Sequence, residues 1–157
     1  MRKEKIVYIV DDGNELVFKI KQMSAIKQER WINRVLILAA GANVLSGVLS
    51  GLKLNKLQNG LKNLTIDKMV SILGGIDYDK VEPLYNELLE CCYHVPDKGN
   101  LNFTTQLNAD NADSIIGDVK TLYKLRMEAL KINFGFFSNG VQSPSQKQAD
   151  IVITKRM

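Results

Sequence analysis

The chain has 157 residues, of which 45% are hydrophobic and 24% charged, a composition that supports one modest core and excludes disorder of the whole chain. Its net charge of +4 comes from Lys and Arg residues interleaved with acidic ones, without the single-sign runs typical of nucleic-acid-binding arms. The opening MRKEKIVYIVDD has too short an apolar run, and no small-residue cleavage site, for a signal peptide.

Two β-rich runs near the start of the chain, Ile6–Val10 and Leu16–Ile20, predict a β-hairpin. They are separated by DDGNE, a cluster of residues that favour tight turns.

The segment from Ser24 to Ala40 predicts a helix, because Ser24 can cap the first turn and no Gly or Pro interrupts the sixteen residues after it. Residues at helical spacing divide this helix into an apolar edge and a basic edge. The apolar edge contains Trp31, Val35 and Leu38, and the basic edge contains Lys27, Arg30 and Arg34.

From Val35 to Leu52 the chain carries no charged residue, which raises a membrane-spanning helix as an interpretation. Gly47 and Gly51 add the G-x-x-x-G spacing that lets membrane helices pack closely. However, Asn43, the glycines and the serines offset most of the gain from insertion, and basic residues flank both ends. We therefore expect a break at residues 41–43 and then a broken helix, or two short ones, packed in a soluble core.

Two more helices are expected in the middle of the chain. Ile66–Leu73 predicts a short helix that ends at two glycines, and Asp79–Cys92 predicts an amphipathic helix. His94–Leu107 contains Pro and Gly and predicts a connecting loop, which can include a short extended piece at Leu101–Thr105.

The longest periodic run predicts a C-terminal helix that ends near Asn133, preceded by the capping residues of Asn108–Asp113. After Phe137 the chain turns polar, so residues 138–157 are expected to form a flexible tail. We therefore predict a single domain over residues 1–137 with a mainly α fold, a compact helical domain of about five helices with an N-terminal β-hairpin at residues 6–20. The apolar stripe of the last helix is expected to contain Ile116, Val119, Tyr123, Met127, Leu130 and Phe134, widened by Leu122, Leu125 and Ala129.

Residues that could carry catalysis or bind a metal are scarce. Cys91, Cys92 and His94 are close in sequence, but adjacent cysteines rarely reach one tetrahedral metal, and a second group of ligands is lacking. The carboxylates of IDYDKVE and LNADNAD lie where helix starts are expected, and no phosphate-binding glycine loop is visible. We expect a protein without enzymatic activity, metal or cofactor, whose thiols stay reduced in a cytoplasm.

Three segments stand in order and together cover most of the chain: FKIKQMSAIKQERWINRVLIL, EPLYNELLECC and IIGDVKTLYKLRMEALKINFGFF. They resemble the tail assembly chaperones of long-tailed bacteriophages. The chain departs from the family pattern at Ser24, where the family often has Pro, and at Gly117, where it has an acidic residue. The matching positions are Phe18, Ile20, Met23, Ala25, Glu29, Trp31 and Arg34, then Pro83, Leu84, Leu88 and Leu89, then Asp118, Val119, Thr121, Leu122, Leu125, Arg126, Gly135, Phe136 and Phe137.

The resemblance implies a non-enzymatic protein that binds the tape-measure protein and helps recruit tail-tube subunits during assembly of the virion tail. It also implies a protein of the host bacterial cytoplasm that is not retained in the mature virion, and it leaves homo-oligomerisation open. A small chaperone could cover the apolar stripes of a long helical tape measure, which would otherwise aggregate before the tube encloses them.

Two surfaces are candidates for such a partner, the helix edge from Met23 to Leu38 and the ending FGFF. The three phenylalanines around Gly135 cannot share one helical face, so we expect at least one in the core, and an exposed apolar surface for a partner stays open as an alternative. Trp31 fits a core position as well as a contact with the partner. Arg34 and Arg126 also fit structural ion pairs. The candidate partner-binding residues are Phe18, Met23, Trp31, Arg34, Arg126, Phe134, Phe136 and Phe137.

Two other classes of function stay open. A small membrane-associated protein would use Val35–Leu54, and a nucleic-acid-binding or regulatory protein of phage origin would use the positive net charge.

Overall fold

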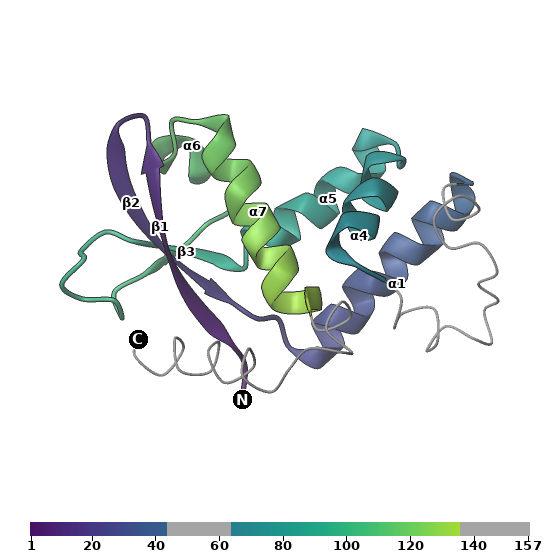
Figure 1. Cartoon of the computed structure of the whole chain (residues 1–157), viewed down its shortest axis with the longest axis horizontal. Coiled ribbons are helices and arrows are strands. Elements are labelled where there is room, and N and C mark those ends of the chain that lie inside the picture. The colour runs from purple at the N-terminus through teal and green to yellow at the C-terminus, as the bar shows by residue number, and fades with distance from the viewer. Residues whose placement is uncertain (44–63, 136–157) are drawn as a thin grey trace.

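The computed structural model of the chain describes residues 1–43 and 64–135. Within these residues the chain forms a four-stranded antiparallel sheet and five helices (Figure 1). The predicted hairpin and the predicted helices at residues 24–40 and 66–73 are confirmed, but two additional strands make the described fold mixed α/β rather than mainly α. The elements in chain order are β1 (Glu4–Asp11), β2 (Asn14–Lys21), α1 (Ala25–Gly41), α4 (Ile66–Gly74), α5 (Tyr78–Leu89), β3 (Cys92–Val95), β4 (Thr105–Gln106), α6 (Ala112–Ile115) and α7 (Val119–Phe134).

The N-terminal hairpin is longer than predicted, because its strands continue to a two-residue turn. Asp12 and Gly13 form this turn with φ angles of 48° and 83°. Positive φ at both positions matches the twist of the flanking strands, and Asp-Gly is a pair that adopts it readily. The turn chemistry therefore sets the register of β1 on β2.

The prediction of a helix from Asp79 to Cys92, followed by a loop from His94 to Leu107, was wrong around Cys92. Helix α5 ends at Leu89, and β3 pairs with the free edge of β2, with Cys92 opposite Ile20 and Val95 opposite Val17. Strand β4 then pairs with β3. The local pattern fits a helix, but the hydrogen bonds of β3 go to a strand more than 70 residues earlier in the chain.

The predicted long C-terminal helix is divided into α6 and α7, because Ile116 adopts an extended conformation (φ −110°, ψ 124°). Most of the predicted apolar stripe is buried, including Ile116, Leu125, Ala129, Leu130 and Phe134, but two of its members, Val119 and Tyr123, are exposed. The buried face of α7 also includes two polar residues, Thr121 and Asn133.

A buried carboxylate holds the start of α7 against the hairpin. Asp11 accepts hydrogen bonds from the backbone N–H groups of Gly117 (2.8 Å) and Asp118 (2.9 Å) and from the Thr121 hydroxyl (2.7 Å). The hydrogen bond from Gly117 is the main cause that lowers the pKa of Asp11 below its usual value, opposed by burial. These three bonds explain both the break before α7 and the burial of Thr121.

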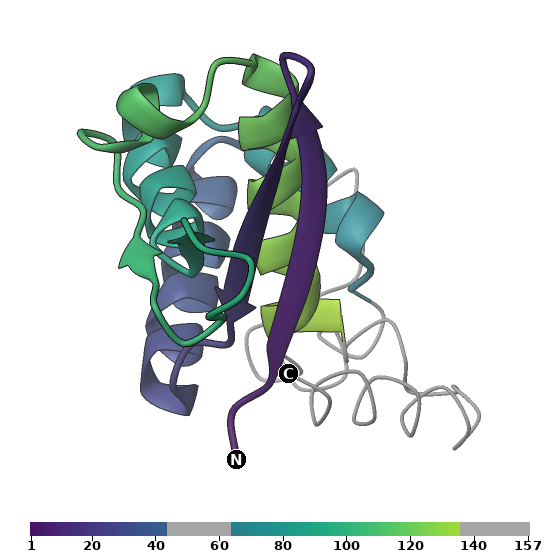
Figure 2. The same cartoon turned by 90° about the vertical axis from the view of Figure 1, so that its left-hand side faces the viewer.

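One face of the hairpin packs on α7, as Figures 1 and 2 show. Val7, Ile9, Phe18 and Ile20 from this face join the main core with residues from the helices. On the opposite face of the sheet, a smaller cluster contains Ile6, Val17 and Val95, with Leu101 packed against it.

Trp31 lies at the centre of the helical layer and is fully buried. Its indole N–H donates a hydrogen bond to the carbonyl oxygen of Leu84 on α5 (3.1 Å), and its ring stacks on Phe134 of α7 with centroids 4.9 Å apart. One side chain thus joins α1 to two other helices.

Helix α1 begins and ends as its sequence predicts. The hydroxyl of Ser24 accepts a hydrogen bond from the backbone N–H of Lys27 (3.3 Å), and the helix ends at Gly41. Within the described residues, none of the helices is both long and apolar enough to span a bilayer. Residues 44–63, where the rest of the charge-free segment falls, lie outside the described part of the chain.

Replacing Trp31 with Ala should lower the free energy of unfolding by about 3–5 kcal/mol, because it leaves a cavity at the junction of three helices. Trp31→Phe should lower the free energy of unfolding by about 1–2 kcal/mol, since the ring can still stack on Phe134 but the hydrogen bond to Leu84 is lost. Urea unfolding followed by circular dichroism measures both changes. Ile26→Ala, on the exposed side of the same helix, is the control, and a loss as large as that of Trp31→Ala would contradict the central position of Trp31.

Asp11→Asn should lower the free energy of unfolding by roughly 2–4 kcal/mol at neutral pH, because an amide offers only one acceptor oxygen to three donors. The pKa of Asp11 is lower in the folded state than its usual value of 3.8, so the wild-type contribution is complete above about pH 5 and fades as the pH falls through the folded pKa. Urea unfolding monitored by Trp31 fluorescence should show that the free energy of unfolding falls at low pH in the wild type and in the exposed turn variant Asp12→Asn. Asp11→Asn should lack this loss. Parallel pH profiles in all three proteins would contradict the assignment.

Candidate functional site

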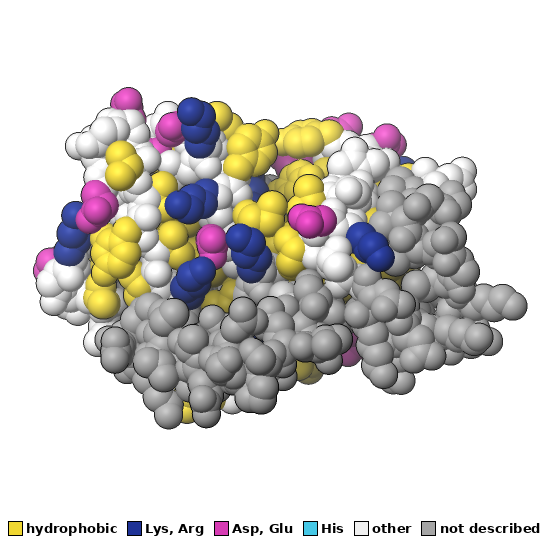
Figure 3. All heavy atoms as spheres, viewed as in Figure 1, with side chains coloured by type: hydrophobic (Ala, Val, Ile, Leu, Met, Phe, Trp, Pro, Cys, Tyr) yellow, Lys and Arg dark blue, Asp and Glu magenta, His cyan; other side chains and the backbone are white. Residues whose placement is uncertain are grey.

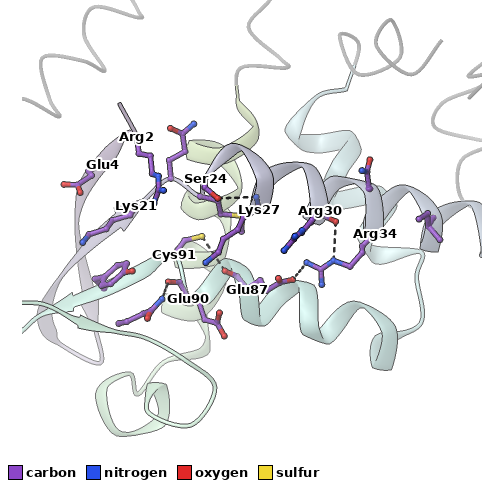
Figure 4. Close-up of a pocket in the computed structure, with 16 residues that line it drawn as sticks. Arg2, Glu4, Lys21, Ser24, Lys27, Arg30, Arg34, Glu87, Glu90 and Cys91 are labelled. Atoms are coloured by element: carbon purple, nitrogen blue, oxygen red, sulfur yellow. Dashed lines mark hydrogen bonds and ion pairs between the residues drawn. The ribbon is translucent and has the colours of Figure 1, made fainter. Parts of the chain in front are cut away.

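A groove with a volume of about 790 Å³ lies between α1, the end of α5 and the adjoining end of the sheet (Figure 4). One wall is the edge of α1 that was predicted to be basic, and the opposite wall comes from the last turn of α5. The residues that line the groove include Arg2, Lys21, Met23, Lys27, Arg30, Arg34 and Ile37, together with Glu4, Glu87, Glu90, Cys91 and Tyr93.

The groove carries more positive than negative charge, with five cationic and three acidic side chains in its lining. Arg34 forms an ion pair with Glu87 across the space between α1 and α5, and its Nε also donates to the carbonyl oxygen of Arg30 (3.3 Å; Figure 4). Both partners of the ion pair are partly exposed, so their attraction is screened by solvent. A ligand that carries both carboxylates and apolar groups matches this lining best.

The sheet end of the groove combines an aromatic ring with a cation. The Nζ of Lys21 lies 4.3 Å from the centroid of the Tyr93 ring, on the neighbouring strand. Cys91 is buried at the base, where its thiol donates to the carbonyl oxygen of Glu87 (3.5 Å). Burial raises the pKa of Cys91 to about 11, so the thiol stays protonated at neutral pH and is a poor nucleophile.

A buried amide holds the start of α1 in place beside the groove. Asn133, at the end of α7, accepts a hydrogen bond from the backbone N–H of Met23 (2.7 Å) and donates one to the carbonyl oxygen of Ala129 (2.8 Å). The side chain of Gln28 donates to the backbone carbonyl of Asn133 (2.9 Å). The α1 wall is therefore fixed to α7 before any ligand binds.

The residues of the CCYH segment are separated by the fold. Cys92 is buried in β3 with its thiol near the carbonyl oxygen of Leu125 (3.5 Å), and the ring of His94 packs at a tilt against Phe18. Burial lowers the pKa of His94. Among the described residues, no three His, Cys, Asp or Glu side chains are grouped as metal ligands.

The family model described as phage tail assembly chaperone protein matches residues 14–143 of the chain.

The chain belongs to the phage tail assembly chaperone family. The match includes the groove wall on α1, the end of α5 and the whole of α7, and it confirms the resemblance carried by the three sequence segments. Searches of curated proteins and of solved structures found no match.

The candidate partner-binding residues of this chaperone fall into four groups. Phe18, Trp31 and Phe134 are buried, so their side chains belong to the core of the described fold. Met23 and Arg34 line the groove, whereas Arg126 lies on α7 beside Tyr85 of α5. Phe136 and Phe137 lie outside the described residues.

Sequence reasoning missed the half of the groove that does not come from α1. Tyr93 and Gln106 reach it because β3 turns back onto β2 and β4 pairs with β3, which the helical pattern around Cys91 concealed. The basic edge of α1 was visible as a repeat of cations, but its opposite wall was not.

Neutralising the ion pair of the groove should change stability little. Arg34→Gln and Glu87→Gln are each expected to alter the free energy of unfolding by less than about 1 kcal/mol, because both side chains are partly exposed. A double-mutant cycle with urea unfolding measures the coupling between them. A coupling well above about 1 kcal/mol would show that the pair holds the two walls together instead of being available to a ligand.

Proposed function

We propose that this chaperone binds the tape-measure protein in the host cytoplasm during tail assembly and helps recruit tail-tube subunits around it. It acts without catalysis and is not retained in the mature virion. The family match supports the general role in tail assembly. The groove is the observation that supports a polypeptide ligand and gives this ligand a place to bind.

The α1 wall of the groove suits a helical ligand. Lys27, Arg30, Arg34 and Ile37 follow helical spacing along one edge, and the edge runs about 15 Å from Lys27 to Ile37, nearly three helical turns. Ile37 is 70% exposed, so the edge offers apolar area as well as charge. An amphipathic helix with acidic residues beside its apolar stripe can bind along such an edge, with its apolar side chains as anchors.

The composition of the groove argues for a protein ligand over nucleic acid. A phosphate backbone would place one negative charge after another against Glu4, Glu87 and Glu90, which are spread through the lining. A polypeptide can place its carboxylates beside the cations only. The acidic residues of the groove therefore select among anionic ligands.

The test is retention of the tape-measure protein by a charge-reversal variant. Lys27→Glu combined with Arg30→Glu should reduce the tape-measure protein that co-purifies with the tagged chaperone by about tenfold or more, because two contacts become repulsive. The matched control is Lys98→Glu combined with Lys120→Glu, which makes the same change in net charge at exposed positions outside the groove.

Normal folding of the groove variant is checked by circular dichroism and melting temperature. Retention of the tape-measure protein at the wild-type level by a folded groove variant would show that the groove is not the binding site. A gel shift with phage DNA at low salt tests nucleic-acid binding in parallel, and high-speed centrifugation of the lysate without detergent tests membrane association.

A further inference from the structure

A second surface lies on the other flank of α5, where this helix packs on α7. It contains Tyr78 and Tyr85 from α5 and Tyr123 and Arg126 from α7, and we call it the tyrosine–arginine patch. Tyr78 and Tyr123 are 66% and 68% exposed. Figure 3 shows hydrophobic side chains gathered over the region where α7 meets α5, next to Lys and Arg side chains.

The side chain of Arg126 is unusual because its charge has no anionic partner in the described part of the chain. Its guanidinium carbon lies 5.9 Å from the centroid of the Tyr85 ring, and its Nε atom is buried without a hydrogen-bond acceptor. A buried donor without an acceptor destabilises the fold, and native proteins rarely keep one without a reason. By contrast, Arg34 in the groove is paired with Glu87.

Arg126, Tyr123 and Tyr78 all lie close enough to Tyr85 to influence its pKa. Burial raises the pKa of Tyr85, the nearby Arg126 guanidinium opposes that rise, and Tyr123 and Tyr78 add to it. Tyr123 and Arg126 are three residues apart on α7, so they are neighbours on its surface. The patch is therefore continuous across the two helices.

The chemistry of the patch resembles the centre of a protein interface. Arginine and tyrosine are enriched among the residues that contribute most to binding, since they combine flat apolar area with directional hydrogen bonds. A carboxylate can accept two parallel hydrogen bonds from the two terminal nitrogens of one guanidinium, which would give the charge of Arg126 an anionic partner. The exposed tyrosine rings would pack against apolar side chains of the ligand that lie beside its carboxylate.

We propose that the tyrosine–arginine patch binds a polypeptide segment that presents one carboxylate among apolar side chains, and that it does so separately from the groove. Tyr85 and Glu87 are two residues apart on α5 and point to nearly opposite sides of the helix, at about 100° per residue. The groove and the patch can therefore hold two segments at the same time. This inference goes beyond the proposed function and does not depend on which protein occupies the groove.

The first experiment uses two synthetic helical peptides that are identical except for a central Glu or Gln flanked by Leu and Phe. Binding to the full-length, ¹⁵N-labelled chaperone is followed by NMR at the Arg126 Nε–H and the Tyr123 backbone amide. The Glu peptide should shift both signals and bind about tenfold more tightly than the Gln peptide. Equal binding of the two peptides, no binding, or shifts confined to the groove would overturn the proposal.

The second experiment separates binding from a structural role of Arg126. Arg126→Met removes the unpaired charge while keeping an apolar side chain, so the melting temperature should stay the same or rise, and the preference for the Glu peptide should disappear. Lys124→Met, the same change at an exposed neighbour on α7, should preserve that preference. A lower melting temperature with an unchanged preference would show that Arg126 is structural, and the proposal would be wrong.

A dilution series of the free chaperone tests whether the patch binds a second copy of this chain. The Arg126 Nε–H signal should be independent of concentration, and a concentration-dependent shift would overturn the assignment to a separate polypeptide. Since the peptides are synthetic, the outcome is independent of the tape-measure experiment. Failure of the tape-measure protein to co-purify with the wild type would overturn the proposed function and leave this inference standing.

Discussion

The position of Trp31 is the constraint on which the helical half of this protein depends. Its indole fills the space between α1, α5 and α7, stacks on Phe134, and donates its N–H to the carbonyl oxygen of Leu84. An indole buried without an acceptor would be costly, so the hydrogen bond also fixes where α5 lies along α1. The groove forms beside this junction because α1 and α5 cannot move apart without breaking it.

Two buried polar side chains complete the frame by holding α7 at both ends. Asp11 binds the backbone at the start of α7, and Asn133 binds the chain just before α1 from the end of α7. The first contact connects the helix to the hairpin and the second connects it to the groove wall. Polar contacts of this kind are directional, so they set the orientation of α7 more narrowly than apolar packing alone does.

The sequence was informative wherever the determinant is local. Asp12 and Gly13 predicted the hairpin turn, Ser24 predicted the start of α1, and the spacing of apolar residues placed Trp31 on the inner edge of that helix. It was misleading wherever the determinant is a distant partner. Strand β3 depends on the free edge of β2, and the burial of Thr121 depends on Asp11, about 110 residues away.

The same distinction explains why the binding surfaces were only half predictable. The cations of α1 repeat at helical spacing and were visible as an edge, but the carboxylates that share their groove come from β1 and from the end of α5. For Arg126, sequence alone could not distinguish a paired cation from an unpaired one, because the difference lies in which acceptors the fold brings within reach.

The two candidate arginines, Arg34 and Arg126, thus differ in their electrostatic surroundings. Arg34 has an acidic partner that a ligand must displace or share, which favours selectivity, whereas Arg126 forms no ion pair within the described residues, so a carboxylate ligand would not compete with an internal partner there. A protein that holds two segments at the same time, as we propose, can use both arrangements, with the groove selecting its ligand and the charge of Arg126 strengthening the second contact.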